Sequence, residues 1–289
     1  MVLPRWRRVG TRNVKGRRYQ NTYIMERAEI MKIATYNIWN DESTLELRAK
    51  QILEEIRAVD ADIIGLQEVS TDFYNNYLAT ESGYVHHGFM QYPGEEEGLA
   101  ILCRYPLIFQ EALYQQEKYA NSLAMNVFFM VDGIRFSLTN VHLPWDSAGK
   151  REHQILAIDR HLHEQKADFH ILLGDFNSDA GSSVDRYLCG DQTLHGYEAN
   201  PPWNDLARAY AARCGDVAKP TLDTVHNPRW AGKKSIYAPE VMDRIYLMDH
   251  WNETKLESVN LFGTEILKKT GYAASDHYGV VAEVIFKKE

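Results

Sequence analysis

Residues 169–179 read FHILLGDFNSD, and this stretch joins a buried strand to a cluster of polar residues. The apolar run at residues 169–173 is short and has polar neighbours, which is typical of a strand inside a sheet. The run ends abruptly at Gly174-Asp175. Because α/β proteins place their sites where strands end, the stretch indicates both a buried sheet and a candidate functional site.

Further strands are expected on both sides of this one. They are predicted from alternating or apolar runs rich in β-formers, at residues 32–38, 62–66, 99–103, 123–131, 135–141, 241–248, 256–261 and 280–286. Asp132-Gly133 predicts a tight turn between two of them.

Helices are expected between the strands. Apolar residues at helical spacing predict them at residues 45–59 and 149–163. A third would begin near residues 73–78 with Thr71 as its N-cap, and a short one would cover residues 204–211. Strands outnumber helices, so we expect one α/β domain whose sheets are covered by helices on their outer faces.

The charge of the chain is unevenly distributed. The 289 residues have a net charge of −8, yet residues 1–24 hold seven basic residues and no acidic one. The remainder has 25 basic residues against 40 acidic ones, a net charge of about −15. Nonspecific binding to polyanions depends on Lys and Arg, so a phosphate-bearing substrate would need a local device such as a bound divalent cation.

Residues 1–30 are interpreted as a basic N-terminal extension that is expected to be disordered. A nucleic-acid or targeting arm is an alternative, and so is translation from an early start codon, since Met25 and Met31 follow. The extension lacks the apolar core of a secretory signal.

Cysteine content and hydropathy bear on location. The three cysteines, Cys103, Cys189 and Cys214, are odd in number and widely spaced, as expected for reduced thiols. No apolar run reaches the roughly 18 residues of a membrane span. We expect a cytoplasmic protein without stable membrane insertion, and a monomer.

Polar residues gather where the predicted strands stop, in six clusters. These are Asn37 in TYNIW, Gln67-Glu68 in LQEV, His142 in NVHLPW, Asp175 and Asn177 in GDFNSD, Asp243 in MDRIY, and Asp276-His277 in SDHYG. A single cluster is weak support, because Asn37 alone could be a turn or cap residue. The ordered set of six is much stronger.

These residue types suit phosphoester hydrolysis. A carboxylate such as Glu68, helped by an amide, can hold Mg²⁺, which keeps several waters and binds phosphate oxygens. Asp175 and Asn177 stand two residues apart after a buried strand. They offer an acceptor to orient a water molecule and a donor to hold an oxygen.

Two histidines could supply positive charge. His277 lies beside Asp276, and His142 has a possible partner in Asp243. Carboxylates can keep such imidazoles protonated, and protonated imidazoles stabilise the charge that develops on a phosphoryl group.

Other metal sites fit the sequence less well. DFNSDAG places Asp175, Asn177 and Asp179 at positions 1, 3 and 5 of a calcium-binding EF-hand loop. Position 6 should then be Gly but is Ala180, and position 12 should be Glu but is Arg186. The EF-hand interpretation therefore fails.

Two histidine pairs and an acidic run are interpreted as surface features. His161 and His163 are spaced i,i+2, so on a helix they would point in different directions. His86-His87 is interpreted in the same way, and residues 95–97 are predicted to form a solvated acidic loop.

In their order, the six clusters resemble the endonuclease/exonuclease/phosphatase superfamily of Mg²⁺-dependent phosphoesterases. The resemblance runs from about residue 32 to residue 286. It implies a four-layer α/β/β/α sandwich, with two packed, mainly antiparallel sheets flanked by helices. It also implies that residues 31–289 form the catalytic domain, with Mg²⁺ as cofactor or Mn²⁺ in its place.

The resemblance also implies roles for the metal and water ligands. Asn37 and Glu68 would bind or orient the metal, and Asp175 would activate or align the attacking water. Asn177 would hold a phosphate oxygen and help to place the nucleophile.

The remaining roles fall to the histidines and their neighbours. His142 would contact the phosphate and be oriented by Asp243. Asp276 would support His277, which would stabilise the transition state, and Asp276 would itself reach the metal.

Within the superfamily, the chain is most similar to the tyrosyl-DNA phosphodiesterase branch. The stretches LQEVSTDFYNNYL, PTLDTVHNP with MDRIY, and VNLFGTEILKKTGYAASDHYGV carry this likeness. Two positions depart from it. Asn121 and Ser122 stand where many members have an Arg, for which Lys150 or Arg244 is a candidate replacement, and Leu222 stands where an aromatic residue is common.

We therefore expect a metal-dependent phosphodiesterase, with DNA ends as a possible substrate. The loop aromatics Trp203, Trp230, Tyr237 and Tyr272 are candidates to stack on a base or ring. The alternative is a phosphatase or sphingomyelinase-type enzyme for a sugar phosphate, inositol phosphate or lipid headgroup, which the acidic body favours. A catalytically inactive binding module is a third hypothesis, and the full polar set argues against it.

Overall fold

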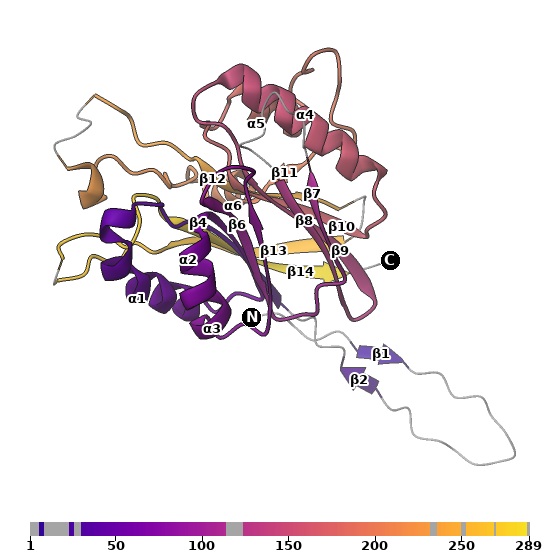
Figure 1. Cartoon of the computed structure of the whole chain (residues 1–289). Coiled ribbons are helices and arrows are strands. Elements are labelled where there is room, and N and C mark those ends of the chain that lie inside the picture. The colour runs from indigo at the N-terminus through magenta and orange to yellow at the C-terminus, as the bar shows by residue number, and fades with distance from the viewer. Residues whose placement is uncertain are drawn as a thin grey trace, which may run out of the picture.

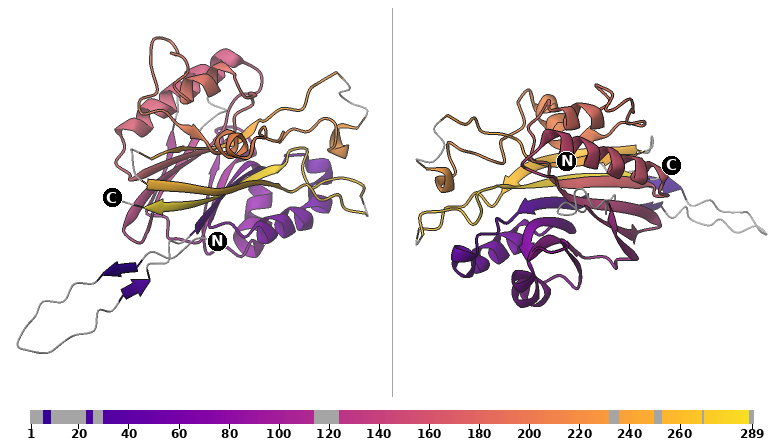
Figure 2. Two further views of the ribbon diagram at one scale, coloured as in Figure 1. Left: turned by 180° about the vertical axis from the view of Figure 1, so that it is seen from behind. Right: turned by 45° about the horizontal axis from the view of Figure 1, so that its top comes forward.

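A computed structural model describes residues 6–8, 23–25, 30–113, 124–231, 236–249, 253–268 and 270–287. Two six-stranded sheets pack face to face, and helices lie on both outer sides (Figures 1 and 2). This confirms the predicted four-layer α/β/β/α sandwich.

The first sheet is built from the N-terminal and C-terminal parts of the chain. Its strands, in spatial order, are β13 (Glu253–Phe262), β14 (Gly279–Lys287), β3 (Ile30–Asn37), β4 (Ile63–Ser70), β6 (Glu97–Cys103) and β5 (His86–Gln91). Strands β3 and β4 run parallel, and the other neighbouring pairs described here are antiparallel.

The second sheet comes from the middle of the chain. Its strands, in spatial order, are β11 (Asn204–Asp205), β12 (Asp243–Met248), β10 (Phe169–Asp175), β9 (Ile134–His142), β8 (Ala124–Val131) and β7 (Phe109–Leu113). Its described pairs are antiparallel except for β9 and β10. Asn121 and Ser122, which stand where many family members have an Arg, lie outside the described residues.

Helices cover each sheet from outside. On the first sheet lie α1 (Glu42–Val59), α2 (Thr71–Phe73), the π-helix η1 (Tyr74–Leu78) and α3 (Ala79–Glu81) (Figure 1). On the second lie α4 (Ala148–Glu164) and α5 (Ser183–Leu188). Strands β10 and β12 are linked by a long connection that contains α6 (Leu206–Cys214) and the 3₁₀ helix η3 (Pro228–Trp230).

Two predicted helix starts were wrong by one or two residues. Ser70, not Thr71, caps α2, because the Ser70 hydroxyl accepts from the Phe73 N–H. Helix α6 begins at Leu206 because Asn204 and Asp205 pair with β12.

The core divides into three apolar clusters, one for each interface between the four layers. Side chains alternate across a strand, and β10 illustrates the result. Ile171 and Leu173 belong to the cluster between the sheets, whereas Leu172 belongs to the cluster beneath α4 and α5. In β3, Ile33 faces the other sheet and Ala34 packs in the α1 cluster.

Several elements were not predicted, including β5, β7, β11, η3 and α5. Strands β5 and β7 are each at the edge of a sheet, where fewer side chains are buried on both faces and the apolar signal is weak. Helix α5 is only six residues long.

The basic N-terminal segment contains a short antiparallel pair, β1 (Trp6–Arg8) and β2 (Tyr23–Met25). The rest of the predicted extension through residue 29, including its predicted disorder, lies outside the described residues. In the described part of the chain, no helix combines the length and apolar character that crossing a membrane requires. Cys103, Cys189 and Cys214 are free thiols.

A candidate active site at the strand ends

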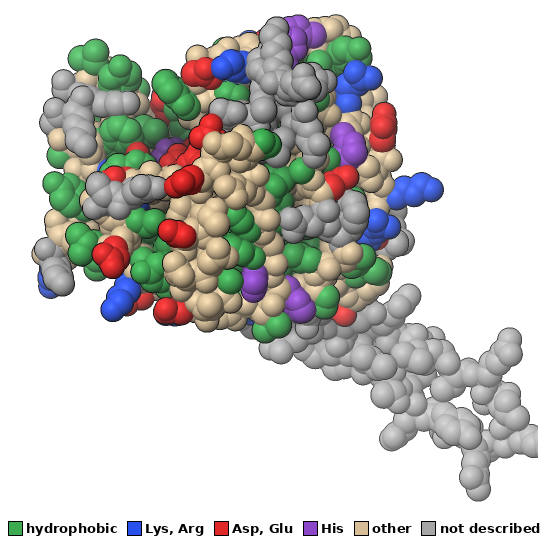
Figure 3. All heavy atoms as spheres, viewed as in Figure 1, with side chains coloured by type: hydrophobic (Ala, Val, Ile, Leu, Met, Phe, Trp, Pro, Cys, Tyr) green, Lys and Arg blue, Asp and Glu red, His purple; other side chains and the backbone are tan. Residues whose placement is uncertain are grey.

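The strand register brings the polar clusters of both sheets together. Asp175 ends β10, where it pairs with His142 at the end of β9 and with Asp243 at the start of β12. In the first sheet, Asn37 at the end of β3 pairs with Gln67 of β4. Figure 3 shows acidic side chains and a histidine gathered at a hollow on the upper left of the viewed face.

Glu68 reaches the site through an irregularity in β4. The pairing of β4 with β6 shifts register between Leu66 and Val69, and Glu68 has a φ of +56°. Gln67 remains buried between the sheets, where its amide donates to Thr35 and Asn140. The bulge thus lets Gln67 point inward while the next residue, Glu68, turns to the strand ends.

Gly174 fixes the end of β10. Its φ is +139°, and a Cβ at this position would lie 1.9 Å from the Val141 carbonyl oxygen. Only glycine fits so close to β9 in this conformation. The Gly-Asp pair that marks the end of the strand in the sequence therefore has a steric cause.

The predicted site residues converge within a few ångströms. His142 Nε2 lies 3.9 Å from Glu68 Oε1 and 3.8 Å from Asp175 Oδ2. His277 Nε2 lies 4.0 Å from the same Asp175 oxygen. Asn37 Nδ2 donates to Glu68 Oε1 and to Asp175 Oδ2, both at 2.9 Å.

The expected histidine partners were wrong. Asp243 Oδ2 is 2.8 Å from Nδ1 of His277, not of His142. Asp243 lies next to Asp175 in the sheet, and the 275–277 loop brings His277 over it, with the His277 N–H donating to Ser275 Oγ. His142 instead faces Glu68 and Asp175.

The electrostatics of this group favour one protonation pattern. Burial lowers the pKa of His277, but the charges of Asp243 and Asp175 raise it by more, to well above its usual value. Burial raises the pKa of Asp175, yet His277 and His142 lower it below its usual value. At neutral pH the site therefore holds a His277 imidazolium against an Asp175 carboxylate.

Asp276 is different from the other acids. Burial, opposed by His277 and aided by Glu68, raises the pKa of its carboxyl to about 6. The charges of Glu68 and Asp175 both raise this pKa, so Asp276 interacts electrostatically with the other acids of the site.

The two predicted asparagines are held by further hydrogen bonds. Asn37 Oδ1 accepts from the Trp39 N–H, so its amide nitrogen faces the carboxylates of Glu68 and Asp175. The Asn177 N–H donates to Asp175 Oδ1, and its side-chain amide donates to the Leu143 carbonyl.

Two overlapping groups of residues have the ligand atoms that a metal ion needs. Glu68, His142 and Asp175 form one, and Asp175, Asp243 and His277 form the other, each with ligand atoms within 4.8 Å of one another. The second group is already joined by the Asp243–His277 hydrogen bond. The first group, near Asp276, has an excess of carboxylate oxygens and fits a hard divalent cation.

One of the predicted aromatic contacts was wrong. Trp203 is 2% exposed, and its indole N–H donates to Asp159 Oδ1 at 2.6 Å beneath α4. It therefore cannot stack on a substrate. Tyr272 is 44% exposed and packs on the Arg229 guanidinium, which in turn lies over the Trp39 ring.

The candidate replacements for the family Arg do not lie free at the site. Arg244 is fully buried and contacts Asp185 and the Tyr246 hydroxyl. It is thus a core residue, and its prediction as a phosphate contact was wrong. The Lys150 ammonium is 2.6 Å from Asp146 in an exposed pair.

A positioning segment was missed in the sequence. Three residues around η3 bind backbone carbonyls of the loop that carries Asp276 and His277: Asn227 to Ser275, Arg229 to Ala273, and Trp230 to Asp276. No strand-end signal marks them, because their role depends on a contact between distant parts of the chain.

The acidic run at residues 95–97 was only partly predicted. Glu95 and Glu96 are exposed, as expected for a solvated loop. Glu97 instead begins β6, is half-buried and binds Asn40.

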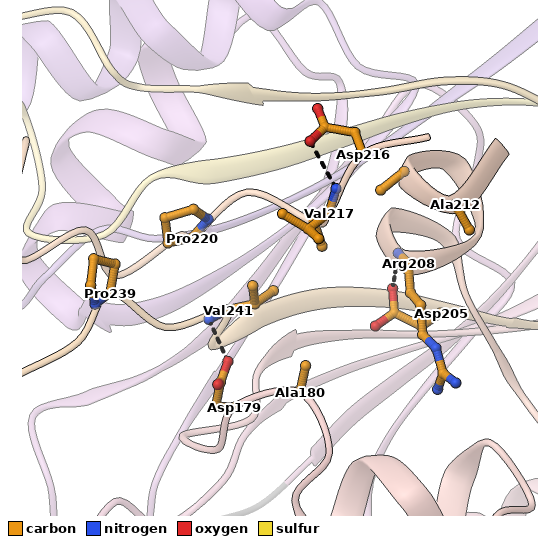
Figure 4. A pocket seen from close by; sticks show the side chains of 12 residues that line it. Asp179, Ala180, Asp205, Arg208, Ala212, Asp216, Val217, Pro220, Pro239 and Val241 are labelled. Atoms are coloured by element: carbon orange, nitrogen blue, oxygen red, sulfur yellow. Dashed lines mark hydrogen bonds between the residues drawn. The ribbon is translucent and has the colours of Figure 1, made fainter. Parts of the chain in front are cut away.

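A pocket of about 560 Å³ lies beside α6 and is separate from this group (Figure 4). Asp179, Asp205, Val217 and Val241 are among the residues that line it. Asp179 accepts from the Val241 N–H, which ties the loop after β10 to the start of β12. The converging acids and histidines do not line this pocket.

Comparisons with known proteins agree with the fold. Residues 34–277 match the model of the endonuclease/exonuclease/phosphatase family. No match was found among curated proteins.

Similar solved structures include zebrafish (D. rerio) TDP2 complexed with single-strand DNA product, with a TM-score of 0.71 and 19% identity over 88% of this chain and 98% of that one. TDP2 from C. elegans has a TM-score of 0.70 and 19% identity over 89% and 75%. The Bacteroides vulgatus endonuclease/exonuclease/phosphatase has a TM-score of 0.70 and 17% identity over 90% and 100%. At these identities the likeness is one of fold.

Proposed function

The chain belongs to the endonuclease/exonuclease/phosphatase family, and on that premise we propose that it hydrolyses a phosphodiester with the help of a divalent cation. The observation that carries this proposal is the convergence of Glu68, His142, Asp175 and His277 at the strand ends. The catalytic domain would be residues 31–289.

Glu68 would hold Mg²⁺, or Mn²⁺ in its place, with Asp276 as a second carboxylate. A bound cation would withdraw charge from the phosphoryl oxygens and offset the repulsion among these acids. Asn37 would keep Glu68 and Asp175 in position through its two hydrogen bonds.

Asp175 would act as the general base. Its low pKa keeps it ionised, and it would accept the proton of the water that attacks phosphorus. Asn177 would contact a phosphate oxygen. Its backbone N–H donates to Asp175 Oδ1, which would hold the carboxylate in position and so fix the direction of attack. The P–O bond to the leaving group would then break in line with the attack.

His277 and His142 would stabilise the charge of the transition state. Asp243 orients His277 and keeps it protonated, so its Nε2–H can donate to a phosphoryl oxygen. His142 would contact the phosphate from the end of β9, next to Glu68. Preorganised charge of this kind commonly accelerates such reactions more than any other single effect.

A DNA end, such as a 5′-phosphotyrosyl end, is the substrate class that we favour. The similar zebrafish structure is a complex with single-strand DNA product, and Tyr272 offers an exposed ring on the segment that leads to Asp276 and His277. The acidic body of about −15 outside residues 1–24 favours the alternative, a phosphatase or sphingomyelinase-type enzyme for a small or lipid-linked phosphate ester, because binding to long DNA uses a basic face.

Metal removal tests the reaction class. Hydrolysis of bis-p-nitrophenyl phosphate should require Mg²⁺ or Mn²⁺, stop in EDTA and return when the metal is added back. Activity that persists in EDTA would contradict the metal-assisted mechanism.

A substrate panel in Mg²⁺ tests the substrate class. It would compare 5′-phosphotyrosyl DNA, abasic duplex, plasmid, sphingomyelin and sugar phosphates, with His277→Ala run beside each one. Turnover of sphingomyelin or a sugar phosphate alone would replace the DNA-end proposal with the alternative.

A further inference from the structure

A second carboxylate lies next to Glu68 and has no part in the mechanism above. Glu97, the first residue of β6, is linked to Glu68 through Asn40. The Asn40 backbone N–H donates to Glu68 Oε2 at 2.8 Å, and its side-chain Nδ2 donates to Glu97 Oε2 at 3.0 Å. One residue therefore holds two carboxylates side by side.

Their proximity is also apparent in the electrostatics. Burial and the charge of Glu68 raise the pKa of Glu97, while the hydrogen bond from Asn40 lowers it. The charge of His142 also acts on Glu97. Asn40 holds Glu97 close to Glu68, and the repulsion between the two carboxylates favours a cation nearby.

Tyr92 is a buried neighbour of Glu97, and its backbone N–H donates to the Glu97 carbonyl at 2.9 Å. It is 2% exposed, and among the described residues its hydroxyl has no hydrogen-bond partner. Burial, then the charges of Glu97, Glu68 and Asp175, raise the pKa of Tyr92. Asn40 Oδ1 is likewise buried and, within the described part of the chain, unbonded.

An unbonded donor and an unbonded acceptor beside paired carboxylates are the partners that water molecules require. Buried polar groups are rarely left unbonded. These two atoms are therefore suited to bind ordered water.

We propose that Glu97, Asn40 and Tyr92 bind the hydration shell of the divalent cation that Glu68 holds. This inference rests on the proposed function. Mg²⁺ gives up its waters reluctantly and keeps several of them in protein sites. Those waters need acceptors, which Glu97 and Asn40 Oδ1 supply, while the Tyr92 hydroxyl can both donate and accept.

Glu97 is in this view a positioning residue, since it acts on the cation through water. Partners of this outer kind are known to change metal affinity by roughly 10–100-fold. Direct ligands and outer partners can be distinguished, because loss of a direct ligand lets one more water bind to the ion.

The experiment uses the full chain and Mn²⁺ as the probe. Affinity is measured by electron paramagnetic resonance, and the number of waters on the bound ion by proton relaxation. Glu97→Gln keeps an oxygen that can accept from Asn40, and Tyr92→Phe removes only the hydroxyl. The control is Glu96→Gln at the adjacent, exposed position.

We expect Glu97→Gln to weaken Mn²⁺ binding by about 10-fold or more, Tyr92→Phe to weaken it to a smaller extent, and Glu96→Gln to leave it unchanged. The number of bound waters should be the same in all of them. Melting temperatures in EDTA within a few degrees of wild type would show that the variants fold.

Two results would overturn the inference: Glu97→Gln binding Mn²⁺ as tightly as Glu96→Gln does, or one additional water on the ion in Glu97→Gln, which would make Glu97 a direct ligand. Neither result affects the proposed function as long as the wild type binds Mn²⁺ and hydrolyses phosphodiesters. A wild type that binds no Mn²⁺ would instead remove the proposed function itself.

Discussion

Two aspartate–histidine pairs in this molecule have a buried aspartate and look alike, but they differ in their surroundings. Asp243 and His277 are 2.8 Å apart at the strand ends. Asp159 and His163 are 3.1 Å apart on α4, the helix that covers the outer face of the second sheet. Both aspartates are about 1% exposed or less, and in both pairs the carboxylate raises the pKa of the histidine.

The Asp159 carboxylate is fully bonded. Oδ1 accepts from the Trp203 indole and Oδ2 from the Tyr187 hydroxyl, each at 2.6 Å. His163 also contacts the Pro201 carbonyl. The pair therefore ties α4 to α5 and to the connection that follows, and a fully bonded buried network of this kind stabilises a fold.

The Asp243 carboxylate is not fully bonded. Its Oδ1 is buried and has no well-aligned hydrogen bond in the described part of the chain, although the Thr221 side chain interacts with the carboxylate and lowers its pKa. Asp175 is its cross-strand neighbour and raises its pKa, in addition to burial. Surplus acceptors and crowded negative charges cost free energy in the folded protein, so their presence here indicates a site that binds a ligand rather than one that holds the fold.

Asp175→Asn tests the strand-end pair and should have the largest effect. We expect kcat for bis-p-nitrophenyl phosphate in Mg²⁺ to fall by roughly 10²–10⁴, because the variant has no carboxylate to accept a proton. The far-ultraviolet circular dichroism spectrum should remain that of wild type. Normal turnover would remove Asp175 from the role of general base.

Asp159→Asn tests the other pair and should have the opposite result. It removes the charge that His163 faces, and we expect the free energy of unfolding in urea to fall by about 2–4 kcal/mol, near the cost of leaving one partner of a buried ion pair alone. The kcat of the folded fraction should stay within about twofold of wild type. Asp72→Asn, at an exposed position, serves as the control.

A loss of turnover without a loss of stability in Asp159→Asn would contradict the comparison. Asp159 would then also have a role in catalysis. Full hydrogen bonding of the carboxylate would not distinguish a structural pair from a catalytic one.

The same comparison explains how much of the site the sequence could predict. Asn37, Glu68, His142 and Asp175 were identifiable because each stands at or near the end of an apolar run, and His277 because it stands just before one. Both signals are local. The same runs predicted one α/β domain whose sheets are covered by helices, since a strand buried on both faces needs a layer on each side. The four-layer sandwich followed from the resemblance to the family.

Pairings between distant residues could not be predicted in this way. Asp243 was assigned to His142 because both are polar ends of strands, yet the 275–277 loop places His277 over it. Trp203 was assigned to the substrate because it lies in a loop rich in aromatic residues, but Asp159 and the core of α4 bury it. In both cases the outcome depends on a partner 34 or more positions away.

Glu97 shows a further limit. In the sequence it is the third of three consecutive glutamates, and nothing distinguishes it from Glu95 and Glu96. The start of β6 at this residue places it beside Asn40. The boundary of an element is among the features that are hardest to locate from sequence.

The pH dependence of stability provides the smallest effect and the sharpest test of the structural pair. Burial lowers the pKa of His163, but the hydrogen bond and charge of Asp159 raise it to about 9, above an unfolded value near 6.5. A raised pKa means that the folded state binds the proton more tightly. The stabilisation is then complete below about pH 6.5 and is lost as the pH rises through about 9.

We therefore expect the difference in unfolding free energy between wild type and His163→Gln to shrink by about 1–3 kcal/mol from pH 6.5 to pH 9, after allowance for solvent screening. Urea unfolding at closely spaced pH values measures it. His195→Gln, which changes a more exposed histidine (42% side-chain exposure), should show no such trend. If the difference instead grew with pH, His163 would be neutral in the folded protein, and Asp159 would be held by Trp203 and Tyr187 without an ion pair.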